Sequence, residues 1–431
     1  MKVLIVGAGP AGIAAARELL HFSIPFDIID SHTSAGGSWN SSNPSSAISP
    51  AVQLITSRRM TSYSDAPMGD SGYPQRKEIL PYLTAYFQSM GIDRFFCGQH
   101  YIESIAMVAD SKWQVSLSRK SKTTYDCIVI ATGANRQVRV PSFSANLSVP
   151  WMHASKYTHP GFFAGKRVLL VGMGNSAVHI AREIVGTAAA VYISTNSGRW
   201  ISPRYDDSGL PTDYPSKLPT DVDDQASGVL EEAQAARQLR PYNEKLWSLG
   251  VPQPEAGPFS HTVIVSDDLI ELMRCEAIQF VNRAIACSGG QVHLSDGRQL
   301  LIDAVVFATG YLAVPKLAAG HLSAEKGSLF GLGSPNNGLY TIGNIDSDIG
   351  GFWTYEVAAS IVARLIDAKR SGQRLNVRLP SLSELSGGCV FPRSNGRLPR
   401  VHGRTYLKAA QSLGHSLGIE VALNSDWKDV L

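Results

Sequence analysis

Two clusters of glycine in the sequence have the spacing that binds the pyrophosphate of a dinucleotide. The first follows an apolar run at residues 2–6, precedes a helical pattern at residues 13–20, and reads Gly7-Ala8-Gly9-Pro10-Ala11-Gly12. In this setting the first glycine permits a tight turn, the second lets the backbone approach the phosphates, and the third lets helix and strand pack closely. The phosphates would lie over the helix N-terminus. Because strand, glycines and helix occur together, we favour a dinucleotide site over a glycine-rich turn without a ligand.

An acidic residue follows the next strand of this first unit. Residues 26–29 predict a strand that ends in Asp30. A carboxylate at this place can accept hydrogen bonds from both ribose hydroxyls of an adenosine. The first site therefore suits an unphosphorylated ribose such as that of FAD.

The second cluster differs from the first in that no acidic residue ends the strand that follows its helix. It lies between an apolar run at residues 167–171 and a helical run at 178–185, and it reads Gly172-Met173-Gly174-Asn175-Ser176-Ala177. Alanine replaces the third glycine, which the motif tolerates. The next strand, at residues 190–193, ends in hydroxyl and amide side chains that include Thr195, and Arg199 and Arg204 follow. An acid there would repel a 2'-phosphate, whereas hydroxyls and arginines could bind one, so this site suits NADPH. The alternative for Arg199 is an ordinary solvated arginine.

One phrase occurs twice. Residues 126–133 and 303–310 each consist of an acid, four apolar residues and Ala-Thr-Gly, and each copy follows a glycine cluster. Each copy predicts the closing strand of its own nucleotide-binding fold, and a glycine at the strand end, such as Gly133, brings the backbone close to a neighbour.

These patterns predict an α/β protein with two Rossmann-like dinucleotide-binding domains, the NADPH domain being inserted in the FAD domain. We expect the FAD domain at residues 1–155 and 303–375, and the NADPH domain at 156–302 with an insertion at 201–258. The insertion could cover the active site or lie on the surface without catalytic consequence. Residues 376–431 form a C-terminal extension that could wrap the FAD domain, close the substrate pocket or make a homodimer contact.

Composition excludes several other classes of protein. The 431 residues are 44% hydrophobic and 17% charged, with a net charge of only +3, which argues against nucleic acid as a partner. No segment approaches the ~20 apolar residues of a membrane span. The five cysteines are far apart, without a C-x-x-C pair, as expected for reduced thiols in a cytoplasmic protein. The missing redox pair also argues against a disulfide reductase, which shares the paired nucleotide folds.

Three further motifs are Gly36-Gly37-Ser38-Trp39, Gly72-Tyr73-Pro74 and the segment at residues 153–157. Together with the two glycine clusters they make the sequence resemble the flavin-containing monooxygenase superfamily, in which a segment similar to residues 36–39 lies beside the flavin. The second copy of the phrase, with Tyr311 after it, fits the family pattern D-x-x-x-[FL]-A-T-G-Y. Ser57 followed by Arg58 is closest to the bacterial and plant branch that includes the indole-pyruvate monooxygenases. The longer F-x-G-x-x-x-H motif is incomplete, since Leu147 and Val149 replace its first two residues.

The resemblance implies an NADPH-dependent FAD monooxygenase. Such an enzyme forms a hydroperoxyflavin with dioxygen and inserts one oxygen atom into a small organic substrate, by N- or S-oxygenation or by oxidation of a keto compound. It implies that Ser57 and Arg58 face the flavin as catalytic residues, and that Gly37, Ser38 and Trp39 bind it. Asp346 would suit the flavin ribityl chain. No metal is required. The alternative is an NADPH-binding flavoprotein oxidase or redox sensor that transfers no oxygen.

Overall fold

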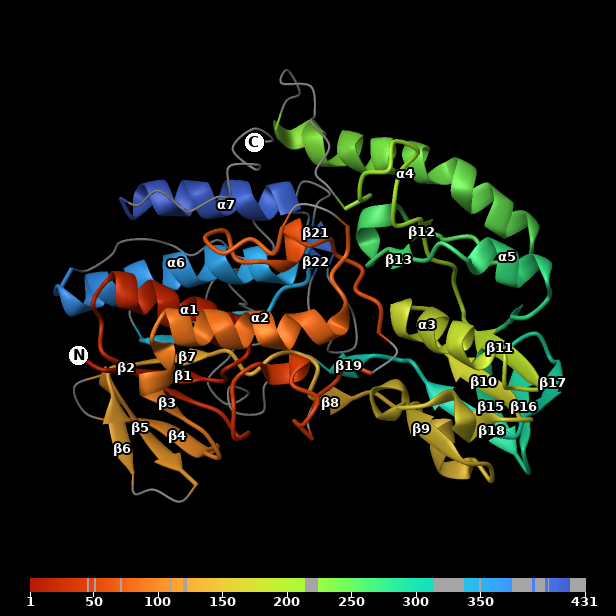
Figure 1. Ribbon diagram of the computed structural model, residues 1–431, viewed down its shortest axis with the longest axis horizontal. Helices are drawn as coiled ribbons and strands as arrows, with labels where there is room; N and C mark the ends of the chain where they lie inside the picture. Colours follow the sequence, from red (N-terminus) through yellow and green to blue (C-terminus); the bar gives the residue numbers. More distant parts are fainter. Residues whose placement is uncertain are drawn as a thin grey trace.

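The structure is a computed structural model that shows two α/β units side by side (Figure 1). It describes residues 1–44, 46–49, 52–69, 72–108, 111–118, 122–213, 224–312, 337–348, 350–373, 390–391, 400–401 and 403–418. The first unit lies at the left of Figure 1 and contains the N-terminus, and the second lies at the right. The paired nucleotide folds expected from the sequence are therefore present.

The first unit is built on a parallel sheet with the order β20-β7-β1-β2-β3. Its strands are β1 (Val3–Val6), β2 (Phe26–Ile29), β3 (Phe96–Cys97), β7 (Cys127–Ile130) and β20 (Leu339–Thr341). Val3 and Ile5 pack against helices, whereas Leu4 and Val6 pack against a second, antiparallel sheet. The sheet is thus covered on both faces, which is why its central strands β1 and β7 are continuously apolar.

Helices and a small sheet form these two covers. Helices α1 (Pro10–His21), α2 (Arg76–Ser89), α6 (Gly351–Arg370) and α7 (Gly403–Ser416) share one core. The other face carries the antiparallel sheet of β4 (Ile102–Val108), β5 (Lys112–Leu117) and β6 (Thr123–Tyr125). In the C-terminal extension, α7 packs on α6 of the first unit (Figure 1). Of the three roles expected for this extension, packing on the first unit is the one that α7 fulfils.

The second unit repeats this plan with the sheet order β14-β11-β10-β18-β9. Its parallel strands are β9 (Trp151–His153), β10 (Arg167–Val171), β11 (Ala190–Ser194), β14 (Gln279–Val281) and β18 (Ala304–Phe307). The unit also contains α3 (Asn175–Ile184), α4 (Asp224–Ser248), α5 (Leu269–Arg274), β12 (Ile201–Ser202), β13 (Ile264–Val265), β15 (Ala284–Ser288), β16 (Gln291–Leu294) and β17 (Gln299–Leu301). Strands β15 to β17 form an antiparallel sheet over one face.

The repeated phrase forms equivalent strands. Strand β7 pairs with β1, and β18 pairs with β10, the strand that leads into the second glycine cluster. The four residues of β18 therefore belong to the second sheet, and the boundary expected at residue 303 falls on the wrong side of this strand. Strand β9 pairs with β18 in turn, so residues 151–153 also belong with the second unit rather than before a boundary at 155. The chain crosses between the units beside the short ribbon of β8 (Gln137–Val138) and β19 (Tyr311–Leu312).

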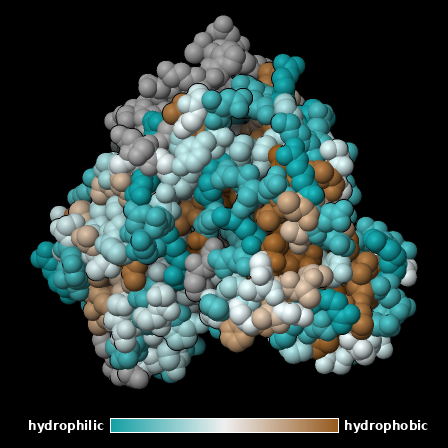
Figure 2. Space-filling view, turned by 45° about the vertical axis from the view of Figure 1, so that its right-hand side comes forward, coloured by the Kyte–Doolittle hydropathy of each residue, from teal (hydrophilic) through white to brown (hydrophobic). Residues whose placement is uncertain are grey.

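Short elements complete the structure. They are the strands β21 (Val390–Phe391) and β22 (Arg400–Val401) and the 3-10 helices η1 (Gly37–Trp39), η2 (Arg59–Thr61), η3 (Ile92–Phe95), η5 (Ser142–Asn146), η6 (Ala154–Lys156), η7 (Pro160–Phe163) and η8 (Pro258–Ser260). Among the described helices, none is both long enough and apolar enough to cross a membrane. The face shown in Figure 2 is mainly hydrophilic, with apolar side chains gathered at its right, over the second unit.

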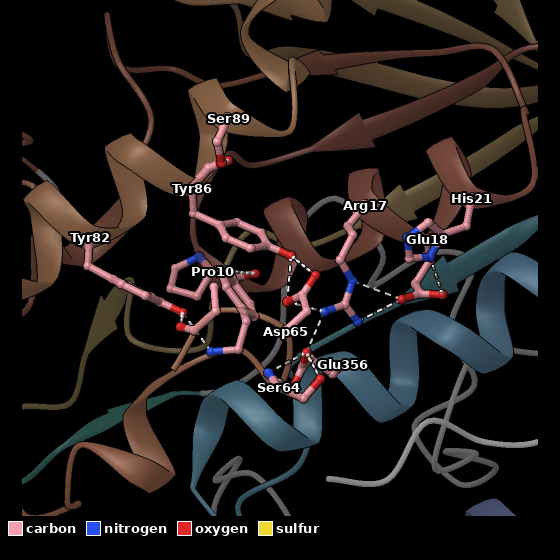
Figure 3. A network of polar contacts seen from close by, with 12 residues as sticks. Pro10, Arg17, Glu18, His21, Ser64, Asp65, Tyr82, Tyr86, Ser89 and Glu356 are labelled. Carbon is pink, nitrogen blue, oxygen red and sulfur yellow. Dashed lines mark hydrogen bonds and ion pairs between the residues drawn. The ribbon is translucent and has the colours of Figure 1, made fainter. Parts of the chain in front are cut away.

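A buried charged cluster holds α1 to α6 (Figure 3). The Arg17 guanidinium donates hydrogen bonds to the carboxylates of Glu356, Glu18 and Asp65. Arg17 and Glu356 are 3% and 5% exposed. Burial alone would lower the pKa of Arg17, but the carboxylates of Glu356 and Glu18 raise it above its ordinary value, so the guanidinium stays charged. Helix α1 begins at the first glycine turn. The ion pairs of Arg17 therefore help to fix the position of this turn in the fold.

Candidate active site

Both glycine clusters open into one cavity between the two units. Its volume is about 2240 Å³, whereas a site for one drug-sized ligand commonly has about 300–1,000 Å³. Its wall includes Gly7, Gly9, Pro10 and Ala11 from the first cluster and Gly172, Gly174, Asn175 and Ser176 from the second. The cavity therefore has room for two extended ligands that meet between the units.

The first glycine of each cluster lies against the repeated phrase. Gly7 has a φ of +107°, and an added Cβ would lie 2.4 Å from the carbonyl oxygen of Ala131. Gly172 has a φ of +109°, and its Cβ would lie 2.6 Å from the carbonyl oxygen of Ala308. Each copy of Ala-Thr-Gly thus closes the strand against which its own glycine turn packs.

The remaining positions of the two clusters are packed in the fold or open to the cavity. A Cβ on Gly12 would lie 1.8 Å from the Gly7 carbonyl oxygen, whereas Ala177 at the matching position is fully buried without conflict. A Cβ on Gly174 would meet no atom within 4 Å, and the nearest atom to one on Gly9 would be the Gly37 Cα at 3.5 Å. Neither α1 nor α3 has a side-chain cap at its N-terminus. The backbone N–H groups at both helix N-termini can therefore donate hydrogen bonds to phosphates. The two glycine clusters thus fit two dinucleotides.

Asp30 lies at the end of β2, on the wall of the cavity. Its carboxylate accepts hydrogen bonds from the backbone N–H groups of Ala8 at 2.8 Å and His32 at 2.9 Å. These bonds fix the carboxylate beside the first glycine turn. This is the geometry that a ribose adjacent to the pyrophosphate requires.

Thr195 and Arg199 line the same cavity at the second unit, as the sequence suggests for a phosphate site. Arg283, which no sequence motif marks, also lines the cavity there. It follows β14, which pairs with β11, and the Thr195 N–H donates to the Val281 carbonyl oxygen at 3.1 Å. Two arginines of the second unit, Arg199 and Arg283, therefore line the cavity together with Thr195 at the end of β11.

Arg204 lies elsewhere. Its guanidinium donates to the Gln53 side-chain oxygen at 2.8 Å and to the Leu54 carbonyl oxygen, and it lies 4.9 Å from the centre of the Tyr73 ring. The expectation that Arg204 could bind the 2'-phosphate is therefore wrong, because its side chain crosses to a loop of the first unit instead.

Ser57 and Arg58 do not line the cavity, although Thr56 directly before them does. Ser57 is fully buried, and its N–H donates to an Asp213 carboxylate oxygen at 2.6 Å. Burial raises the pKa of Asp213, although this N–H opposes the shift. Arg58 pairs with Glu78 in the first turn of α2 at 2.7 Å. The two residues expected beside the flavin thus bind Asp213 and Glu78 instead, whereas Thr56, Met60 and Thr61 of the same segment line the cavity.

The segment expected beside the flavin does line the cavity. Gly37, Ser38 and Trp39 form η1, which packs against the first glycine turn, since a Cβ on Gly37 would lie 2.9 Å from the Gly9 Cα. Gly133 also lines the cavity. Asn175 lines it as well, but its amide is bonded to the backbone of Val263 and Val265, so its side chain positions α3.

Two further polar groups lie where the units meet. His153 lies on the cavity wall, 3.2 Å from the Gly310 carbonyl oxygen through Nε2, and burial lowers its pKa. Asp346 also lines the cavity, and its carboxylate pairs with Arg400 at 3.1 Å. The Arg400 contact was not foreseen, because no motif marks the C-terminal residues.

Similar proteins are flavin-dependent oxygenases. The chain is 26% identical over 331 residues to flavin-containing monooxygenase 3 of Oryctolagus cuniculus, and the match covers 72% of this chain and 62% of the relative. It is equally identical to dimethylaniline monooxygenase [N-oxide-forming] 2 of Mus musculus, of which it covers 61%. The chain thus spans about three fifths of the length of these curated relatives.

Solved structures share the fold. The S-allyl-L-cysteine S-oxygenase of Allium sativum superposes with a TM-score of 0.63 at 17% identity, over 99% of this chain and 91% of that one. A steroid monooxygenase bound to NADP superposes with a TM-score of 0.65 at 16% identity, over 86% of each chain. The family model for flavin-binding monooxygenase-like proteins matches residues 1–331. The chain therefore belongs to the flavin-binding monooxygenase-like (FMO-like) family.

Proposed function

We propose that this chain is an NADPH-dependent FAD monooxygenase. It would insert one oxygen atom from dioxygen into a small organic substrate, by N- or S-oxygenation or by oxidation of a keto compound. The observation that carries the proposal is the single cavity into which both glycine clusters open. Two dinucleotides bound at these clusters would share one cavity, as hydride transfer between them requires.

The first unit would bind FAD and the second NADPH. The α1 N-terminus would hold the FAD pyrophosphate, Asp30 its ribose, and η1 would lie beside the flavin. The α3 N-terminus would hold the NADPH pyrophosphate. Bound FAD would supply the chemistry by accepting hydride and activating dioxygen. The chain itself would bind and orient the nucleotides and the substrate, and it would exclude water. His153 would be neutral, because burial lowers its pKa.

Ser57 and Arg58 would act through their loop. Ser57 N–H and the Arg58 side chain anchor the loop to Asp213 and Glu78. We therefore propose Thr56 as a residue of this loop that contacts ligand. We also propose that the chain crosses between the two units at β8 and β19. A cytoplasmic location is proposed from the scattered cysteines of the sequence. The place of the chain near the indole-pyruvate branch stays a prediction.

The proposal is tested by reducing the bound flavin in the absence of air. NADPH is expected to bleach the flavin absorbance much faster than NADH at equal concentration. Replacement of Arg199 or Arg283 by Ala is expected to raise the KM for NADPH about tenfold to a hundredfold, because each variant loses a charge-assisted contact to the 2'-phosphate. The KM for NADH should change little, so the preference for NADPH is lost.

Arg298→Ala is the matched control, because this arginine pairs with Asp296 at 2.7 Å and does not line the cavity. Its preference for NADPH should equal that of the wild type. Unchanged preference in both Arg199→Ala and Arg283→Ala would remove these residues from the phosphate site. A wild-type flavin that NADPH does not reduce would contradict the proposed function itself.

A further inference from the structure

Arg400 lies beyond the residues that the family model matches, yet its side chain is buried where the two units meet. The residue is 3% exposed. Its guanidinium contacts the Asp346 carboxylate at 3.1 Å, the Phe259 carbonyl oxygen at 2.9 Å and the Thr262 hydroxyl at 3.3 Å. Asp346 belongs to the first unit, whereas Phe259 and Thr262 belong to the second. One side chain therefore joins the units.

The backbone around Arg400 is anchored to the first unit. The Val401 N–H donates to the Asp346 carbonyl oxygen at 3.0 Å, and the Gly403 N–H donates to an Asp348 carboxylate oxygen at 2.8 Å. Farther along, the Tyr406 hydroxyl in α7 donates to the Thr354 carbonyl oxygen at 3.1 Å. The arginine thus extends from a firmly held segment of the first unit toward the second.

The groups that Arg400 contacts belong to the cavity wall. Asp346 lines the cavity from the first unit and Thr262 lines it from the second, and the Thr262 hydroxyl donates directly to Asp346 at 3.2 Å. A buried guanidinium needs partners for its charge, so its bond to the Phe259 carbonyl and its pair with Asp346 favour the same closed arrangement. Separating the two units would expose or orphan these groups together.

We propose that Arg400 is a positioning residue for NADP(H), which holds the loop at residues 259–262 of the second unit against Asp346 of the first. This inference rests on the proposed function, because it assigns the second site to NADP(H). Arg400 does not line the cavity and acts through Thr262 and Asp346, which do. It thereby keeps the second nucleotide site in the arrangement that faces the first.

The proposal is tested by measuring FAD content and the Kd for NADP+ on the same preparations of full-length holoenzyme. Arg400→Met is expected to keep the FAD content of the wild type and to raise the Kd for NADP+ about tenfold, by isothermal titration. Asp346→Asn should have a similar effect, and the double variant should be no worse than either single one, since both remove the same contact. Arg400→Lys should recover only part of the affinity, because an ammonium lacks the planar fork.

Arg298→Met is the matched control, with an arginine whose ion pair lies away from the cavity, and its Kd should equal that of the wild type. If Arg400→Met does not fold, Thr262→Val keeps the ion pair and removes the hydroxyl of the second unit, with an expected rise in Kd of about threefold. A Kd within twofold of the wild type in Arg400→Met, or in Thr262→Val when that variant replaces it, would overturn the proposal. Loss of FAD in parallel with NADP+ would also overturn it, because Arg400 would then only support the first unit. Wild-type protein that binds no NADP+ would overturn the proposed function as well. The wild-type measurement therefore distinguishes a failure of the proposed function from a failure of the Arg400 proposal alone.

Discussion

Gly9→Ala is expected to yield protein without FAD, whereas Gly174→Ala is expected to retain FAD and lose NADP+. Each glycine precedes the first residue of its helix and lines the cavity. Neither position has a positive φ, and an added Cβ would not approach another protein atom closer than 3.5 Å. The methyl group would therefore leave the fold intact and occupy the space that the phosphates need. We expect each Kd to rise about a hundredfold, from steric conflict and lost N–H contacts.

The two variants control each other. FAD is measured as the ratio of flavin absorbance to protein after desalting, and NADP+ by isothermal titration of the same desalted preparations, whether or not they retain flavin. Loss of both nucleotides from each variant would mean that the sites are not dedicated to different nucleotides. Loss of FAD from Gly174→Ala alone would reverse the assignment of the units.

Arg17→Met is expected to lower the free energy of unfolding by about 3–5 kcal/mol, because it leaves buried carboxylates without their cation. Glu356 also accepts hydrogen bonds from the backbone N–H and the hydroxyl of Ser64, so it cannot turn to solvent (Figure 3). Urea unfolding followed by circular dichroism measures the change. Arg167→Met removes a half-buried arginine paired with Asp303 and should have a much smaller effect. Equal urea midpoints for the two variants would contradict a stabilising role for the buried cluster.

The loss in Arg17→Met should also depend on pH. Burial raises the pKa of Glu356, while Arg17 opposes the shift, so removal of Arg17 should raise this pKa further. A carboxyl whose pKa is higher in the folded state than in the unfolded state loses stability as the pH rises through the folded value. The variant should therefore be more destabilised at pH 8 than at pH 5. The double variant Arg17→Met/Glu356→Gln should recover part of the loss, since it removes one of the unpaired charges.

Local sequence was sufficient to predict the two nucleotide folds. The glycine turns, the strands before them and the closing strands are each contained in a few consecutive residues, and a close backbone contact within its own unit requires glycine at positions 7, 12 and 172. Asp30 could be placed for the same reason, because it directly ends the strand beside the first turn. Thr195 and Arg199 follow a strand of the second unit in the same way.

The contacts between the units could not be predicted in this way. Arg204 has the sequence position of a phosphate ligand, but its direction is set by Gln53 and Tyr73, which lie more than a hundred residues away. Arg283 lines the cavity at the second unit because it follows β14, which pairs with β11. No local sequence pattern predicts this pairing. The backbone N–H of Ser57 donates to the carboxylate of Asp213, which lies 156 residues farther along the chain. The domain boundary expected at residue 303 was wrong because β18 joins the second sheet. Each of these outcomes rests on pairing across the fold rather than on residue type.

The central claim, oxygen transfer from dioxygen, is tested most directly with isotopically labelled dioxygen. Holoenzyme is mixed with NADPH and ¹⁸O₂ in unlabelled water, in the presence of an aryl alkyl sulfide, a small primary or tertiary amine or a 2-keto acid as probe, and the products are analysed by mass spectrometry. The proposed function predicts one ¹⁸O atom in the oxygenated product of at least one probe, with NADPH consumed in equal amount. NADPH consumption that yields only hydrogen peroxide, with no labelled product from any probe, would contradict it and favour an oxidase or redox sensor.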